Sequence, residues 1–318
     1  MAPILALYPG QGSQSPGMAL DLHQASKQVK ELFSLASEAA HTDLYALLST
    51  AGEDDLKQTR NAQLAITLAS RSAYYRLREV NCTFKAHSGF SHGELAAYAG
   101  GGILDDFTLF SIIEKRAALM DEMSEKATKT QGELGMAAII GLGFSQVNEA
   151  IHASKLKGVY PSNDNGPAQV VVAGLAASIT LLKPVLMEMG AKRVIPLKVS
   201  GPFHTPFMEE ATESFLAFLE TQTFSDPKEL VISSVDGSVI TTKEDARGHL
   251  ARQLACPVRW TAVLANVKKL SASNPLSIAE VGYGTVLTGL CKNSGLDLVC
   301  RSLGTESAIQ EFAKEMIL

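Results

Sequence analysis

The sequence predicts an α/β protein in which a larger domain with a parallel sheet carries an inserted smaller subdomain. Residues 4–8 form a short, continuous apolar run that leads into a glycine-rich loop, as buried parallel strands commonly do. Residues 83–99 contain an extended segment, the turn Gly89-x-Ser91-x-Gly93 and a helix-forming run, the order typical of an α/β-hydrolase-like domain. Residues 128–197 follow the order β-α-β-β-α-β, which is a ferredoxin-like arrangement.

The composition is that of an ordinary globular chain. Its 318 residues are 46% hydrophobic and 19% charged, enough for one large domain or two modest ones. A net charge of −5 without a lysine or arginine block argues against a duplex nucleic-acid partner. The four cysteines form no C-x-x-C pair, which indicates reduced thiols and no metal site. The N-terminal apolar run is too short to cross a membrane, so we expect a cytoplasmic protein with no membrane partner, and a monomer.

The first third of the chain supplies a glycine-rich loop and several helices. The loop at residues 9–14 follows the first strand, at the end where α/β proteins place ligand contacts, but it lacks the Lys-Ser/Thr of a phosphate-binding loop. Helical periodicity covers residues 29–39 and 44–48, and a longer helix covers about 61–79. Gln63 lies early in that helix, where its side chain either faces a functional site and donates hydrogen bonds or is solvated.

Ser91 is the candidate nucleophile. In a strand–turn–helix context, small residues two before and two after the serine let the backbone cross itself closely. The hydroxyl then stands clear of the sheet, and the N-terminus of the following helix offers N–H groups to a developing oxyanion. Ser88 is a weaker candidate, because Ala86 and Phe90 take the places of the two glycines.

A helix over about residues 107–126 follows, capped by Asp105 or Asp106. Apolar residues recur along it at helical spacing, and Arg116 lies at the edge of the apolar face. Most arginines in such a place extend to water, and the alternative is that Arg116 binds a ligand.

The inserted subdomain is expected at residues 128–197, between the two parts of the larger domain at 1–127 and 198–318. Pro184 predicts a kink or a late start in its second helix, and Gly190 is suited to end that helix. A cleft is expected at the seam between the two units. The predicted strands are 136–140, 158–162, 169–173 and 193–197, and the helices are 145–154 and 176–189.

The chain then returns to the larger domain. An apolar helical face begins at Met208, and Asp236-Gly237 forms a turn after a strand. The other elements predicted here are strands 230–235, 277–281 and 298–300, a helix at 243–254 and a helix that starts near Trp260.

His204 is the candidate base for Ser91. It is one of seven histidines and lies in the rigid loop Gly201-Pro202-Phe203-His204-Thr205-Pro206, between a strand and a helix, where a base can be held within reach of the serine. His92 is adjacent to Ser91, but the turn would direct its ring away from the hydroxyl. No acid follows in the usual hydrolase order, so a backbone carbonyl is expected to fix the imidazole tautomer of a Ser–His dyad.

Six motifs in order resemble the malonyl-CoA:acyl carrier protein transacylase family of type II fatty-acid synthesis. The resemblance runs from about residue 4 to residue 293. The motifs are Gly10-Gln11-Gly12-Ser13-Gln14, Gly89-x-Ser91-x-Gly93-Glu94, Arg116 with Met120, Gly201-Pro202-Phe203-His204, Gln253 with Pro257-Val258-x-Trp260, and Val281-Gly282-x-Gly284-x-Val286-Leu287-x-Gly289-Leu290.

The resemblance implies a role for each matching residue. Ser91 would be acylated by malonyl-CoA with His204 as base and then acid, and the Gln11 and His92 backbone N–H groups would form the oxyanion hole. Arg116 would pair bidentately with the malonyl carboxylate. The other substrate-binding residues implied are Gln63, Met120, Phe203, Asn163, Asn165, Gln169 and Gln253, whose backbone carbonyl would also hold His204. No cofactor is implied, because malonyl-CoA is a substrate and the phosphopantetheine belongs to the acyl carrier protein.

The chain departs from the family at three places. The family usually has histidine at position 90 and an aliphatic residue at 92, whereas this chain has Phe90 and His92. The side chain at 92 is expected near the acyl pocket. Lys85 and His87 replace more apolar residues, and Tyr283 stands where the family often has proline.

Three other functions compete with malonyl transfer for fatty-acid synthesis. A free-standing acyltransferase of a polyketide pathway would use the same residues and differ in the carrier protein accepted. A serine hydrolase of acyl thioesters would use water as acceptor and would not need Arg116. A non-catalytic carrier-binding module would not need Ser91, His204 and Arg116 together.

Overall fold

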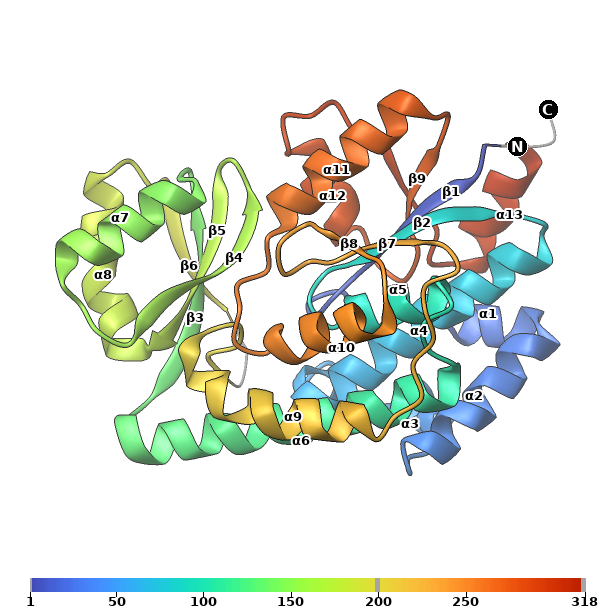
Figure 1. The fold of residues 1–318 in the computed structure, drawn as a ribbon, viewed down its shortest axis with the longest axis horizontal. Coiled ribbons are helices and arrows are strands. Elements are labelled where there is room, and N and C mark those ends of the chain that lie inside the picture. Colours follow the sequence, from blue (N-terminus) through green and yellow to red (C-terminus); the bar gives the residue numbers. More distant parts are fainter. Residues whose placement is uncertain (1, 198–200, 316–318) are drawn as a thin grey trace.

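The structure, a computed structural model, describes residues 2–197 and 201–315. It contains two separate sheets that lie at opposite ends of the molecule (Figure 1). The strands of the larger sheet are β10 (Cys300–Ser302), β9 (Ser277–Glu280), β1 (Ile4–Tyr8), β2 (Phe84–Gly89), β7 (Leu230–Ile232) and β8 (Val239–Ile240), in that spatial order. Those of the smaller sheet are β4 (Val159–Gly166), β5 (Gln169–Leu175), β3 (Leu134–Ile140) and β6 (Arg193–Leu197).

The larger sheet is parallel except at one edge. Neighbouring strands from β10 to β7 run parallel, but β8 pairs with β7 in the antiparallel direction, so the prediction of a purely parallel sheet was wrong there. The cause is the turn at Asp236-Gly237, which folds the chain back on itself; Gly237 has φ 80°. This turn also ends β7 at Ile232 rather than at 235, and the last strand lies two residues later than predicted.

Both faces of the larger sheet are buried, as the continuous apolar run of β1 predicts. Ile4, Ala6 and Tyr8 face a core shared with the N-terminal helices, whereas Leu5 and Leu7 face a second core with α11 (Trp260–Ser273) and α12 (Val286–Lys292). Because β1 and β2 pair in parallel, the loop after β1 and the turn after β2 emerge at the same edge of the sheet.

The smaller sheet is antiparallel and has helices on one face. α7 (Phe144–Ser154) and α8 (Ala176–Glu188) pack on one face of the sheet, around residues such as Ile139 and Val172. Pro184 lies inside α8, so the late start allowed from the sequence was wrong. β4 is longer than predicted and contains Asn163 and Asn165.

Backbone hydrogen bonds join β4 of the smaller sheet to the segment before α11, which packs on the larger sheet. The Asp164 N–H donates to the Val258 carbonyl (2.8 Å), and the Val258 N–H donates to the Ser162 carbonyl (2.9 Å). The Asp164 carboxylate also accepts from Thr261 Oγ1 (2.5 Å) and pairs with Arg259 (3.6 Å). The smaller sheet is thus fixed against the segment that starts α11.

Apart from α1, where no helix was predicted, the remaining helices follow the predictions with shifted ends. They are α1 (Leu20–Ala25), α2 (Lys27–Ala39), α3 (Leu44–Thr50), α4 (Thr59–Glu79), α5 (Gly93–Gly100), α6 (Asp106–Gln131), α9 (Glu209–Glu220), α10 (Lys243–Arg252) and α13 (Glu306–Glu315), with short 3₁₀ turns at Asp55–Lys57 and Pro206–Met208. Asp105 caps α6 through the Thr108 N–H (2.7 Å), whereas Asp106 pairs with the buried Arg71. The predicted domain boundary at 127 falls inside α6, and the one at 198 lies outside the described residues.

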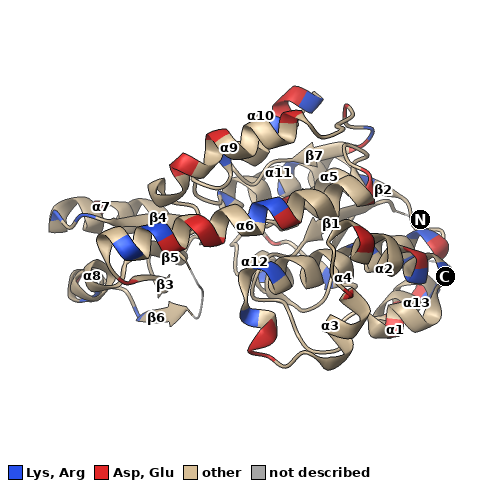
Figure 2. Ribbon diagram, turned by 90° about the horizontal axis from the view of Figure 1, so that it is seen from below, with Lys and Arg blue, Asp and Glu red and all other residues tan. Residues whose placement is uncertain are grey.

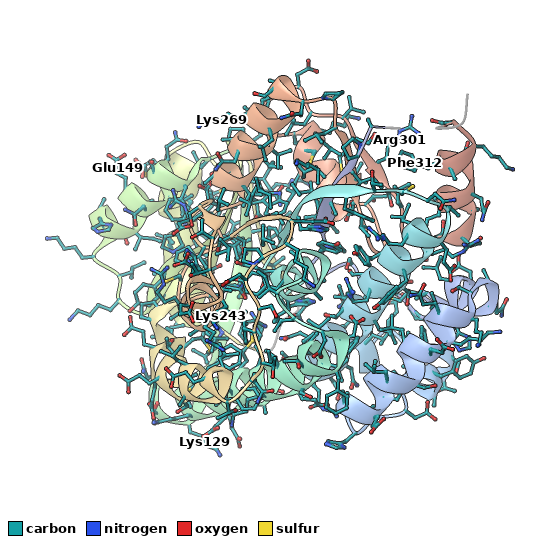
Figure 3. The ribbon with its side chains drawn as sticks, turned by 45° about the vertical axis from the view of Figure 1, so that its right-hand side comes forward. Lys129, Glu149, Lys243, Lys269, Arg301 and Phe312 are labelled. Atoms are coloured by element: carbon teal, nitrogen blue, oxygen red, sulfur yellow. The ribbon has the colours of Figure 1, made fainter. Side chains whose placement is uncertain are left out.

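Basic and acidic residues alternate along the outer helices, α6 among them (Figure 2). Lys129, Glu149 and Lys269 project from the periphery in Figure 3, whereas Lys243 lies over the middle of that view. At the end of the molecule that holds both termini, the Arg301 guanidinium lies 5.6 Å from the centre of the Phe312 ring, which joins β10 to α13. No described helix is long and apolar enough to cross a membrane.

Candidate active site

Ser91 occupies the tight turn between β2 and α5 that the sequence predicts. Its backbone has φ 53°, a left-handed conformation that is uncommon for residues other than glycine. The turn is closed so tightly that a Cβ on Gly89 would lie 2.0 Å from the Gly93 carbonyl carbon, and one on Gly93 would lie 2.4 Å from the Tyr8 carbonyl oxygen. Both glycines are therefore required by close backbone approach.

The structure brings Ser91 and His204 together. Ser91 Oγ lies 2.7 Å from His204 Nε2, and His204 Nδ1 lies 2.8 Å from the Gln253 carbonyl oxygen. A carbonyl only accepts, so Nδ1 carries the proton and Nε2 accepts from the serine hydroxyl. His204 also has a left-handed backbone, with φ 61°, and its N–H donates to the Leu254 carbonyl (3.1 Å).

The imidazole of His204 is neutral at physiological pH. Burial and, to a smaller extent, the positive charge of Arg116 lower its pKa to about 4 against the opposing backbone hydrogen bonds of Gln253 and Cys256. A neutral imidazole with a free lone pair on Nε2 can take the proton of Ser91.

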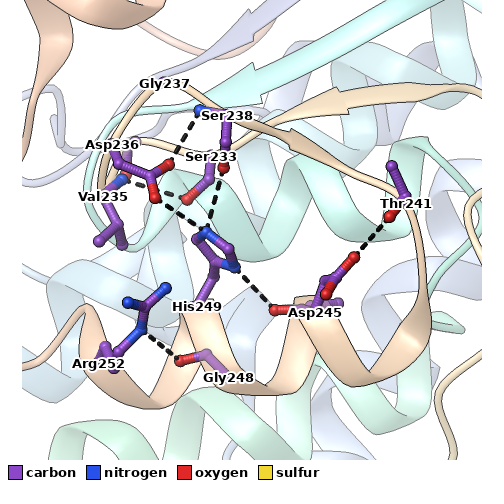
Figure 4. Close-up of polar contacts among 12 residues, drawn as sticks. Ser233, Val235, Asp236, Gly237, Ser238, Thr241, Asp245, Gly248, His249 and Arg252 are labelled. Atoms are coloured by element: carbon purple, nitrogen blue, oxygen red, sulfur yellow. Dashed lines mark hydrogen bonds and ion pairs between the residues drawn. The ribbon is translucent and has the colours of Figure 1, made fainter.

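A second serine–histidine contact lies elsewhere and differs in geometry (Figure 4). Ser238 Oγ and Asp236 Oδ2 both approach the same nitrogen of His249, Nε2, at 3.1 and 3.2 Å. The other ring nitrogen contacts the carbonyl of Asp245 in its own helix (2.9 Å). Because serine and carboxylate share one nitrogen, this cluster lacks the relay of serine, base and orienting group that nucleophilic catalysis needs.

Arg116 is buried within α6 instead of extending to water. Nη1 donates to Gln63 Oε1 (2.9 Å) and contacts Met120 Sδ (3.0 Å), while Nη2 donates to Gln253 Oε1 (3.0 Å). A guanidinium has five N–H donors, so Nε–H and one Nη2–H remain free. Among the described residues Arg116 has no ion pair, and burial lowers its pKa to about 10, at which it keeps its charge.

Gln253 connects these groups, and Glu94 fixes Gln253. The Gln253 amide nitrogen donates to the Ser91 carbonyl (3.0 Å) and to Glu94 Oε2 (2.6 Å), so its oxygen faces Arg116. Glu94 is fully buried and also accepts from Ser234 Oγ (2.6 Å) and from Tyr98 (3.2 Å). The role of Glu94 was missed from the sequence; the signal available was a carboxylate inside an otherwise apolar helix.

A cavity of about 360 Å³ opens beside Ser91 and His204, between the two sheets. Predicted site residues in its wall are Gln11, Asn163, Asn165, Gln169 and Phe203. Wall residues to which the sequence analysis gave no role are Gly12, Gln14, Met136, Ala138, Val171, Leu197, Val286 and Leu290. The helix-free face of the smaller sheet thus forms one side of the cavity.

The remaining predicted residues lie behind this wall. Gln63, Arg116, Met120 and Gln253 form the buried cluster described above and do not line the cavity. His92 does not line it either; Phe90 does, packed edge-on against Trp260 at 5.3 Å.

The predicted oxyanion donors lie at fitting places in the backbone. Gln11 follows β1 and lines the cavity, and His92 precedes the first residue of α5. Within the described part of the chain, neither N–H donates a backbone hydrogen bond. The described residues include no cluster of three or more histidine, cysteine, aspartate or glutamate side chains that could hold a metal ion.

The chain is similar to known proteins over nearly its whole length. Residues 6–304 match the acyl transferase domain family. The malonyl CoA-acyl carrier protein transacylase of Bacillus subtilis is 34% identical over 294 residues, which are 92% of this chain and 90% of that protein. The protein of the same name from Haemophilus influenzae is 35% identical over 312 residues, 96% of this chain and 97% of its own.

Solved structures give the same result. The acyl carrier protein S-malonyltransferase of Vibrio cholerae has a TM-score of 0.90 and 32% identity, covering 98% of this chain and 100% of that one. A malonyl-transacylase in complex with its type II PKS acyl-carrier protein has a TM-score of 0.90 and 30% identity, covering 99% and 100%. The chain therefore belongs to the acyl transferase domain family, among the malonyl CoA-acyl carrier protein transacylases.

Proposed function

We propose that this chain transfers a malonyl group from malonyl-CoA to the phosphopantetheine thiol of acyl carrier protein, through a malonyl ester on Ser91, and so supplies fatty-acid elongation. The observation that carries the proposal is the position of a charged, unpaired guanidinium directly behind a Ser–His dyad. The guanidinium is linked to the buried Glu94 carboxylate through Gln253 and makes no direct ion pair among the described residues, so a carboxylate bound there would supply one. Membership of the transacylases supports the choice of malonyl as the acidic acyl group.

In the first half-reaction His204 Nε2 takes the proton of Ser91 as Oγ attacks the thioester carbonyl of malonyl-CoA. The Gln11 and His92 backbone N–H groups stabilise the oxyanion. When the C–S bond breaks, the CoA sulfur leaves with the proton from His204, and malonyl-Ser91 remains.

The second half-reaction reverses these steps with a new thiol. His204 takes the proton of the phosphopantetheine thiol, the sulfur attacks the ester carbonyl, and Ser91 Oγ leaves with that proton. Arg116 keeps the carboxylate fixed between the two steps, while Gln63, Met120 and Gln253 fix Arg116. Asn163, Asn165, Gln169 and Phe203 contact the acyl chain or the pantetheine arm from the cavity wall.

Intact-mass measurement after incubation with malonyl-CoA tests the proposal. We expect a single malonyl adduct that is lost in Ser91→Ala and retained in Ser238→Ala, the matched variant of the other serine–histidine contact. Subsequent addition of holo acyl carrier protein should move the malonyl group to the carrier. If the protein forms no adduct with any acyl-CoA, the proposal that it is an acyltransferase is refuted.

A polyketide pathway is the second candidate, because one similar structure holds a type II PKS acyl-carrier protein. The two candidates share every chemical step and differ only in the carrier. Transfer rates to a fatty-acid carrier and to a polyketide carrier, measured side by side, distinguish them.

We also propose a division of the chain into two structural units. The strand order β4-β5-β3-β6 with α7 and α8 on one face supports a ferredoxin-like subdomain at 128–197, inserted into an α/β-hydrolase-like domain at 1–127 and 198–318. Unpaired Cys82, Cys256, Cys291 and Cys300 support a cytoplasmic location. A monomer that needs no cofactor stays a prediction.

A further inference from the structure

Two fully buried nitrogen atoms near the dyad have no hydrogen-bond partner among the described residues. One is Nε2 of His92, whose side chain is only 1% exposed, and the other is Nε of Arg116, which is 0% exposed. Buried polar groups in folded proteins nearly always have partners, so each exception calls for an explanation, such as a bound water, an ion or a ligand.

The two nitrogens belong to one small region. His92 directly follows Ser91, and Gln253 bonds to both the Ser91 carbonyl and Arg116. Burial lowers the pKa of His92 well below its usual value, and the nearby Arg116 and His204 lower it further. The ring is therefore neutral and carries one N–H donor beside a permanent positive charge.

His92 does not act as a second base. Ser91 Oγ already contacts His204 Nε2 at 2.7 Å, and no hydrogen bond joins His92 to the serine among the described residues. A packing role alone leaves the imidazole unexplained, because an aliphatic side chain would fill the same space without burying an unpartnered nitrogen.

We propose that His92 is a specificity-determining residue, whose imidazole N–H and the Arg116 Nε–H together receive the carboxylate of the acyl group on Ser91. This inference rests on the proposed function. A carboxylate has two oxygens with several acceptor positions, so it satisfies both donors at once. The acyl group is attached to Ser91, the residue before His92 in the chain. Acyl groups without a carboxylate leave both nitrogens unpartnered and are disfavoured.

The test compares His92→Gln with His92→Met, two side chains of similar length of which only glutamine carries an N–H donor. For His92→Met we expect kcat/KM with malonyl-CoA to fall about 10–100-fold, the usual effect of losing a hydrogen bond to a charged group. With acetyl-CoA we expect a change of less than about threefold. His92→Gln should recover most of the malonyl activity, and His152→Leu, at an exposed histidine, should change neither substrate.

Each other outcome overturns the inference. Equal losses on malonyl-CoA and acetyl-CoA, or a glutamine variant no better than the methionine variant, would reduce His92 to a packing residue. Thermal unfolding of each variant verifies folding, and His92→Leu replaces His92→Met if the latter does not fold. If the wild-type protein forms no malonyl adduct, both the proposed function and this inference are wrong. If the adduct forms but His92→Met leaves the ratio of kcat/KM for malonyl-CoA and acetyl-CoA unchanged, only this inference is wrong.

Discussion

Arg116 is the single residue on which the choice of substrate depends most. Replacing it with alanine removes the charge but leaves the Ser91–His204 contact in place. We expect malonyl transfer to lose about 2–5 kcal/mol of transition-state stabilisation, because a desolvated charge pair is lost. Transfer of acetyl should fall far less. The measurement is kcat/KM for both acyl-CoA substrates.

The control for Arg116→Ala is Arg78→Ala, which removes an exposed arginine of α4. This variant should leave both substrates unaffected. An equal loss on malonyl and acetyl in Arg116→Ala would remove the carboxylate-binding role and favour a structural one.

At the scale of a single element, the turn between β2 and α5 tolerates no side chain at Gly89. A Cβ there would lie 2.0 Å from the Gly93 backbone, which only a shift of the strand or the helix can relieve. We expect Gly89→Ala to lower the free energy of unfolding by at least about 2 kcal/mol, a strain effect. Urea denaturation measures this change.

Gly248→Ala in α10 is the matched control, since a Cβ there meets no atom within 4 Å. In a helix interior alanine is favoured over glycine, so this variant should gain up to about 1 kcal/mol. A Gly89→Ala protein as stable as the wild type would show that the turn relaxes without cost.

Much of each element was predictable from local sequence. The tight turn at Ser91 was predicted from Gly89-x-Ser91-x-Gly93 between a strand and a helix. His204 was predicted as the base because its loop is made rigid by Pro202 and Pro206. The strand and helix order held along the chain. β8 was missed because a strand of two residues is too short to show an alternating pattern. The full length of β4 was missed because polar residues such as Asn163 are not typical of a buried strand.

The contacts around Arg116 could not be predicted, because α4, α5, α6 and the segment after α10 meet only in the folded chain. Helical spacing alone left open whether Arg116 extends into water or binds a ligand, and whether Gln63 is solvated or faces the site; both are buried. The side chain at 92 is buried and is not part of the cavity wall, in which Phe90 lies instead. Whether a polar residue is buried depends on how these helices pack together, which the local sequence does not show.

For the whole molecule, three buried histidines make stability depend on pH. Burial lowers the pKa of His87, His92 and His204, the last to about 4. Below about pH 6.5 the unfolded chain binds protons at these positions that the folded chain does not. Unfolding free energy is therefore greatest above that pH and falls as the pH drops, by about 1.4 kcal/mol per pH unit for each histidine while the pH lies between its unfolded and folded pKa values.

Urea midpoints at pH 7.5, 6.0 and 5.0 measure this dependence. His92→Met should show a smaller loss on acidification than the wild type, because one of the three groups is gone. His152→Leu should keep the full loss. A midpoint that stays constant from pH 7.5 to 5.0 would contradict the burial of these rings as neutral imidazoles.

Both members of the dyad have a left-handed backbone, Ser91 at φ 53° and His204 at φ 61°. For an L-residue this conformation costs about 1–2 kcal/mol, and glycine adopts it freely. A screen that rewards heat resistance alone would therefore favour glycine at these two positions and select against activity. Thermostable variants of this protein should be sought with positions 91 and 204 held fixed, because stability and turnover are in direct competition there.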